Sequence, residues 1–108
     1  MLYVIAGDQS RELKVNKIIK EIKEKNPSLQ EKYFDALLGE DQLFLQQAST
    51  NSIFGGQELL ILKRAESIKK VEDLLKAIKN LDLSSKELVI SIETDEKNST
   101  TIEGKKTS

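Results

Sequence analysis

Short strand-like segments and amphipathic stretches alternate along the chain. Apolar runs at Leu2–Ala6, Glu58–Arg64 and Glu87–Ile92 have the length and the branched residues of buried strands. Gln30–Asp35, which carries two aromatic residues, predicts a further short strand. A turn at residues 7–10 follows the first strand, and its Asp8 or Ser10 can cap the helix that begins there.

Three stretches between these strands predict helices. The first covers residues 10–25 and ends before Pro27, because the residue preceding proline is disfavoured in the α region. The second covers residues 41–49, with Leu45 and Ala48 facing inward. The third begins near Ser67. The apolar stripes of the first and third helices have a helical period and consist of Leu13, Val15, Ile18, Ile19 and Ile22, and of Ile68, Val71, Leu74, Leu75 and Ile78.

The resulting order, β-α-β-α-β-α-β, predicts an α/β fold. Strands that alternate with helices form a parallel sheet of about four strands, with helices on both faces in a three-layer, Rossmann-like arrangement. Each crossover should be right-handed. We expect residues 1–93 to form one domain, and residues 94–108, whose one large apolar residue is Ile102, to be a flexible tail or the start of a missing domain.

The composition limits the kinds of site and partner that the chain can have. The formal net charge is -1, which gives no overall attraction to nucleic acid or to an anionic membrane. Cysteine and histidine are absent, so disulfides and thiolate metal sites are excluded, together with the commonest general base and metal ligand. The apolar N-terminus lacks the basic region of a signal peptide, and no run approaches the ~20 apolar residues of a membrane span. We therefore expect a cytoplasmic protein without a metal or a cofactor.

Gly7 and Asp8 occupy the place where a nucleotide-binding α/β domain has its phosphate loop. A P-loop needs a second glycine and a Lys-Ser/Thr pair, and neither follows Gly7. The strand that should end in a magnesium-binding carboxylate ends in Lys63 and Arg64 instead. The sequence therefore predicts no ATP hydrolysis. Gly7 and Asp8 are either a degenerate phosphate loop or a plain tight turn.

Three segments together resemble the N-terminal domain of the delta subunit of the bacterial clamp loader of DNA polymerase III. They are Tyr3–Asp8, Tyr33–Asp35 and, most specifically, Ser52–Glu66. The resemblance covers residues 1–93. It implies a degenerate P-loop domain of the AAA+ type, with the strands in the spatial order 2-3-4-1 and no ATPase activity.

The resemblance also implies a role and a contact. Such a subunit binds the ring-shaped sliding clamp (the beta subunit) and helps to open it during DNA replication, through an apolar residue followed by phenylalanine at the end of a helix. These positions fall on Ile53 and Phe54, flanked by Gln46, Gln47 and Ser52. Delta subunits also have lid and collar domains, which these 108 residues do not include, so the chain is expected to be either an excised domain or an unusual short homologue. Contacts with other clamp-loader subunits are expected only if those domains exist elsewhere. DNA would be reached indirectly.

Other interpretations stay open at this point. Ile53 and Phe54 could plug the core at the edge of the sheet. The basic face of the first helix could meet DNA phosphates, although an ordinary solvated face is the simpler interpretation; it consists of Arg11, Lys14, Lys17, Lys20, Lys23 and Lys25. The main rival function is a stand-alone flavodoxin-like or receiver-like interaction domain, although Lys63 stands where a receiver would carry its phosphoacceptor. A small enzyme of this topology is the third alternative.

Overall fold

The computed structural model describes residues 1–50 and 56–94, and the backbone of residues 100–103. The elements in chain order are β1 Leu2–Gly7, α1 Arg11–Lys25, β2 Gln30–Asp35, a 3-10 turn at Ala36–Leu38, α2 Asp41–Ser49, β3 Glu58–Lys63, a 3-10 turn at Ala65–Ser67, α3 Val71–Lys79, β4 Lys86–Glu93 and β5 Thr100–Glu103.

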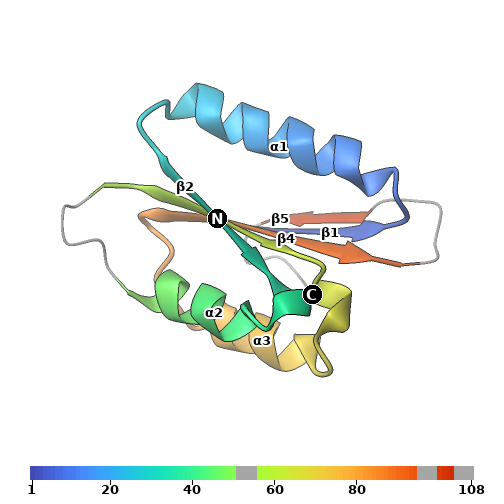
Figure 1. Cartoon of the computed structure of the whole chain (residues 1–108). Coiled ribbons are helices and arrows are strands. Elements are labelled where there is room, and N and C mark those ends of the chain that lie inside the picture. The colour runs from blue at the N-terminus through green and yellow to red at the C-terminus, as the bar shows by residue number, and fades with distance from the viewer. Residues whose placement is uncertain (51–55, 95–99, 104–108) are drawn as a thin grey trace.

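The strands form one sheet in the order β2-β3-β4-β1-β5. β2, β3, β4 and β1 pair in parallel, with Glu58 beside Lys86 and Leu2 beside Leu88. This arrangement confirms the predicted four-stranded parallel sheet and its order 2-3-4-1. α1 covers one face, and α2 and α3 cover the other, which gives the three predicted layers (Figure 1).

β5 lies within the segment that the sequence led us to expect as a tail. Its backbone pairs antiparallel with β1, with Tyr3 opposite Glu103 and Ala6 opposite Thr100. This segment forms a strand because β1 would otherwise be the outermost strand of the sheet, with a row of unpaired backbone N–H and C=O groups. The parallel core is thus extended by one antiparallel strand.

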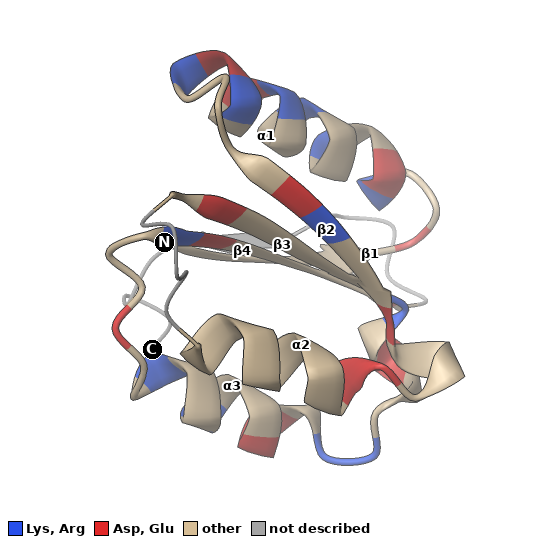
Figure 2. Cartoon of the chain, turned by 60° about the vertical axis from the view of Figure 1, so that its left-hand side comes forward, with Lys and Arg blue, Asp and Glu red and all other residues tan. Residues whose placement is uncertain are grey.

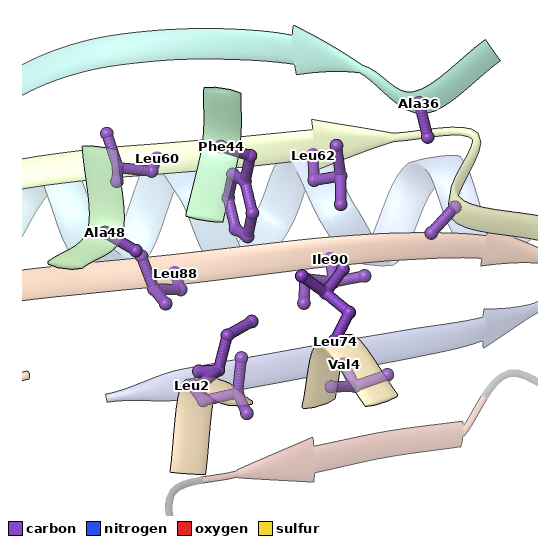
Figure 3. Packing of buried hydrophobic residues seen from close by; sticks show 12 residues of the cluster. Leu2, Val4, Ala36, Phe44, Ala48, Leu60, Leu62, Leu74, Leu88 and Ile90 are labelled. Atoms are coloured by element: carbon purple, nitrogen blue, oxygen red, sulfur yellow. The ribbon is translucent and has the colours of Figure 1, made fainter. Parts of the chain in front are cut away.

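The sheet separates two apolar cores, because alternate residues of a strand point to opposite faces. On one face Ile5, Leu59, Ile61 and Val89 pack against the stripe of α1. On the other face, Phe44 and Ala48 of α2 and Leu74 and Ile78 of α3 cover the second set of strand residues (Figure 3), which comprises Leu2, Val4, Leu60, Leu62, Leu88 and Ile90. The central strands β3 and β4 are buried on both faces, as their continuous apolar runs predict.

Two details of the helices differ from the sequence prediction. Leu13, assigned to the apolar stripe of α1, is 77% exposed, because it lies about 200° around the helix from Val15. α3 begins at Val71 rather than near Ser67. Ser67 instead closes a 3-10 turn by donating its Oγ hydrogen to the carbonyl of Arg64.

Candidate functional site

The turn between β1 and α1 holds the two residues predicted as a degenerate phosphate loop. Gly7 ends β1, and Asp8 accepts two hydrogen bonds through Oδ1, from the backbone N–H of Ser10 at 2.9 Å and from its Oγ at 2.6 Å. These bonds to Ser10 hold the pKa of Asp8 below its usual value. An ionised carboxylate therefore stands in this turn at neutral pH, and it repels a phosphate group. The prediction that the chain does not hydrolyse ATP stays a prediction.

Arg11 is the side chain at this turn that the sequence interpretation misplaced. It was assigned to the solvated basic face of the first helix, but it is only 3% exposed. Its Nε donates to Oγ of Ser91 on β4 at 2.9 Å, and a terminal nitrogen donates to the carbonyl of Asp8 at 3.1 Å and lies 3.5 Å from Glu93. Helical spacing could have predicted the burial of Arg11, because this residue precedes the buried Val15 by one turn and so lies on the same face of α1.

The ends of β2 and β3 meet at the same carboxyl-terminal edge of the sheet. Arg64 follows β3 in a left-handed conformation, with φ 56° and ψ 43°. Its guanidinium binds both carboxylate oxygens of Asp35, with Nε 2.8 Å from Oδ1. Such a two-point pair fixes the orientation of both side chains, and bonding to Arg64 lowers the pKa of Asp35. Two of the segments that carry the family resemblance therefore touch here.

Of the predicted clamp-binding residues, Gln47 lies at the opposite, amino-terminal edge of the sheet. Ser52, Ile53 and Phe54 lie outside the residues that the structure describes. Gln47 is in the last turn of α2, and its Nε2 donates to Oε2 of Glu58, the first residue of β3, at 3.0 Å. Gln46 is exposed. The described flanks of the predicted contact thus lie where α2 ends and β3 begins.

Glu58 is the centre of a polar cluster that sequence reasoning missed. Its carboxylate accepts hydrogen bonds from Lys86 on β4 and from Lys32 on β2, the latter at 3.2 Å. The side chains of Glu58 and Lys86 are 4% and 2% exposed. Burial by itself would raise the pKa of Glu58, but the donors Lys86, Lys32 and Gln47 outweigh it, and the pKa is lowered. The signal in the sequence was the alternation of Glu58 with Leu60 and Leu62, which places it on a buried face.

α2 also differs from the other helices in charge. After Asp41 the helix carries no charged side chain, and Figure 2 shows the rest of α2 without charge, in contrast to the strongly charged α1 on the opposite face of the sheet. The neutral stretch continues beyond α2, since none of residues 42–57 is Asp, Glu, Lys or Arg in a chain that is 32% charged. Leu43 on this helix is 53% exposed. The outer surface of α2 therefore combines an exposed leucine with uncharged polar residues.

The structure places the described residues of the two predicted sets, Gly7 and Asp8 in one and Gln47 in the other, far apart in the fold. Gly7 and Asp8 lie at the carboxyl-terminal edge of the sheet, whereas Gln47 reaches the first residue of a parallel strand at the other edge. The two sets are therefore separate features. Among the described residues, no group of three or more carboxylates could hold a metal ion, and no described helix is long and apolar enough to cross a bilayer.

These features define an α/β domain with a four-stranded parallel core and helices on both faces. Comparisons with protein-family models, with curated proteins and with solved structures gave no match to this chain. Its function must therefore be argued from the residues and from the geometry described above.

Proposed function

We propose that this chain is the N-terminal domain of a delta-like subunit of a bacterial clamp loader. In this role it binds the sliding clamp and helps to open it during DNA replication, without hydrolysing ATP. The proposal goes beyond the fold, which many unrelated functions share, and rests on the resemblance of Tyr3–Asp8, Tyr33–Asp35 and Ser52–Glu66 to that family. The strand order 2-3-4-1 agrees with it.

One observation carries the assignment of the binding surface. The charge-free stretch of residues 42–57 includes the outer side of α2 and leads into Ile53 and Phe54. The centres of protein interfaces are depleted in charged residues and enriched in aromatic ones. In a chain with so many charged residues, an uncharged stretch of sequence that contains Ile53-Phe54 is the place where a partner with an apolar pocket would bind.

The absence of ATP hydrolysis is proposed on separate grounds. Asp8 stands ionised in the β1–α1 turn, and Arg11 is engaged by Ser91 and by the carbonyl of Asp8. We expect that the chain releases no phosphate from ATP and Mg²⁺ in a colorimetric assay. Phosphate release above that of a sample lacking the protein would contradict this half of the proposal.

Binding to a bacterial sliding clamp, measured by calorimetry, tests the main claim. Phe54→Ala should weaken the complex by about 30-fold or more, since truncation of an aromatic anchor typically costs ~2 kcal/mol or more. Leu13→Ala is the matched control, because it removes an apolar side chain that is 77% exposed on α1, across the sheet from α2. Its affinity should equal that of the unaltered chain.

Circular dichroism of each variant shows whether it is folded. The proposal is wrong if the folded, unaltered chain does not bind the clamp. It is equally wrong if Phe54→Ala binds as tightly as the unaltered chain, because Ile53-Phe54 would then be part of the core or unrelated to the contact.

A further inference from the structure

β2 is one of the two outer strands of the sheet and the outer strand of its parallel core (Figure 2). The backbone groups of its even-numbered residues bond to β3, since the N–H of Gln30 donates to the carbonyl of Gln57 and the ladder continues in steps of two. The N–H and C=O groups of Glu31 and Tyr33 therefore point away from the sheet. In the part of the chain that the structure describes, no group bonds to them. An open edge of this kind is a template for a further strand.

The open part of this edge has a defined length. Before it, the N–H of Leu29 donates to the carbonyl of Asn26 at 3.2 Å. After it, Glu40 bonds to both outward groups of Asp35, because its Oε1 accepts from the N–H at 2.9 Å and its own N–H donates to the carbonyl at 3.1 Å. The backbone groups of two residues are left open between these closed ends.

These open groups match those of a second copy of the chain. In an antiparallel ladder, two residues that face one another exchange both N–H···O bonds, and the next such pair lies two positions along. If Glu31 faces Tyr33 of a second copy, then Tyr33 faces Glu31 of that copy, and the two pairs use every open group. The two-fold axis then passes beside Lys32. A register shifted by two residues in either direction would need backbone groups that are already bonded at one of the closed ends.

The charges on β2 do not exclude this pairing. Charged side chains on an edge strand often prevent association, but each charged side chain of β2 has an oppositely charged partner within its own chain. The pairs are Glu31–Lys23, Lys32–Glu58 and Asp35–Arg64. The two Lys32 side chains would be neighbours at the axis, and each would bring its own Glu58 carboxylate.

Exposed apolar side chains gather around the same edge. Six large apolar side chains are exposed among the described residues, and four of them lie on β2, in the turn after it or on α2, which contacts β2. These four are Tyr33, Leu37, Leu38 and Leu43. A two-fold axis perpendicular to the sheet would place α2 and its copy on the same face of the extended sheet, and α2 carries no charge after Asp41 that would repel the copy.

We infer that the open edge of β2 is a self-association surface, where a second copy of the chain pairs antiparallel with the first and extends the sheet across a two-fold axis. A second copy fits better than an unrelated strand, because the open groups and the closed ends of β2 are complementary to themselves in one register. The inference does not depend on the proposed function, since it uses none of the residues assigned to the clamp contact.

The association state of the full chain tests the inference. In sedimentation equilibrium, we expect the mass to rise with concentration from that of one chain toward that of two. Glu31→Pro should raise the dissociation constant of the dimer by at least about tenfold, because it removes two backbone hydrogen bonds per dimer and places a ring where the second strand would lie. It removes no bond to β3, since the N–H of Glu31 points outward, where proline is tolerated in an edge strand.

Glu31→Ala is the matched control, because it loses the same side chain and the same ion pair with Lys23 but keeps the backbone N–H. Its dissociation constant should stay within about threefold of that of the unaltered chain. Circular dichroism shows whether each variant is folded. A chain that remains monomeric at every concentration would overturn the inference. So would a folded Glu31→Pro that dimerises as tightly as Glu31→Ala.

Disulfide formation tests the register and does not need the proline variant. The chain has no cysteine. Lys32→Cys would place two thiols at a pair that is not hydrogen-bonded, where the Cα atoms are about 4.5 Å apart and a disulfide can form. Gln30→Cys lies on the same face of β2, but its two copies would be about 14 Å apart. Oxidation should therefore link Lys32→Cys into dimers at least about tenfold faster than Gln30→Cys. Equal rates for the two variants would show that the chains associate through another surface, and the inference would be wrong.

Discussion

Arg11 shows how one charged side chain can be part of the interior. Its guanidinium connects the first turn of α1 to β4 through Ser91 and to the β1–α1 turn through the carbonyl of Asp8. Buried charges are tolerated when they are paired and hydrogen-bonded, and Glu93 and Glu12 lie 3.5 and 3.6 Å from its terminal nitrogens. The residue therefore links the first turn of α1, the β1–α1 turn and β4 through polar contacts.

Replacing this residue tests that role. Arg11→Met should lower the free energy of unfolding by about 2–3 kcal/mol, because the hydroxyl of Ser91 and the carbonyl of Asp8 lose a charged donor. Lys14→Met, an exposed change on the same helix, should alter it by less than about 0.5 kcal/mol. Urea unfolding followed by circular dichroism measures both. Equal stabilities for the two variants would show that Arg11 is replaceable.

The lowered pKa of Glu58 predicts that the free energy of unfolding depends on pH. Its pKa in the folded chain is lower than the ordinary 4.5, so the unfolded state binds a proton more readily. The contribution of Glu58 is therefore fully present above about pH 4.5 and is lost as the pH falls through the lowered pKa. In urea unfolding at pH 7, 5 and 3.5, the double variant Glu58→Met/Lys86→Met should lose less stability on acidification than the unaltered chain.

The other carboxyl groups with a lowered pKa, among them Asp8, Glu31 and Asp35, remain in both proteins. The difference between the two pH profiles therefore isolates the contribution of Glu58. Parallel profiles would mean that the lysines do not stabilise its ionised form.

At the scale of elements, α2 joins the core through few residues. Phe44 is fully buried and lies edge-on to Phe34, with the ring centres 5.7 Å apart, and Ala48 is 2% exposed one turn later. The sequence placed Leu45 and Ala48 inward, and both pack against the core, Ala48 fully and Leu45 partly buried, but it did not single out Phe44. The helix is thus attached mainly by one aromatic side chain, with Ala48 and Leu45 packed beside it, and by the Gln47–Glu58 hydrogen bond at its end.

Phe44→Ala should therefore lower the free energy of unfolding by about 3–5 kcal/mol, the usual cost of emptying an aromatic site in a core. Leu43→Ala, next to it but 53% exposed, should change it by less than about 1 kcal/mol. Thermal unfolding of both variants makes the comparison. A small effect of Phe44→Ala would mean that α2 relaxes onto the sheet and that its place is set by other contacts.

The helices and strands could be predicted wherever the spacing of apolar residues along the sequence is typical of one kind of element. The residues of β3 and β4 have few alternatives to a buried parallel strand, and the stripe of Val15, Ile19 and Ile22 fixes one face of α1. The errors arose where residue type was given more weight than position. Leu13 is apolar but lies off the stripe, and Arg11 is charged but lies on it.

Other features depend on partners that are distant in the sequence. Glu58 and Lys86 are 28 positions apart, and only the register of β3 against β4 brings them together. β5 was not predicted because its segment has little apolar character, and its place is set by the open edge of β1. The residues assigned to the clamp contact follow from family resemblance, since periodicity does not distinguish Ile53 and Phe54 from core residues.

At the scale of the whole molecule, the sheet keeps two polar features at opposite edges. The Arg11 and Arg64 pairs belong to the carboxyl-terminal edge, and the Glu58 cluster belongs to the amino-terminal edge, with the apolar layers between them. Each of these buried or paired charges links segments that lie far apart in the chain. Polar contacts therefore fix the ends of the sheet, while apolar packing fixes its faces.

The neutral surface of α2 has a consequence for the kinetics of any complex formed through it. Charged patches accelerate encounter and make association sensitive to ionic strength. A surface without charge lacks this attraction, so its association rate constant should stay near the unassisted ~10⁵–10⁶ M⁻¹s⁻¹ and change little with added salt. How long such a complex lasts would then be decided by its dissociation rate, which the fit of a few apolar side chains controls.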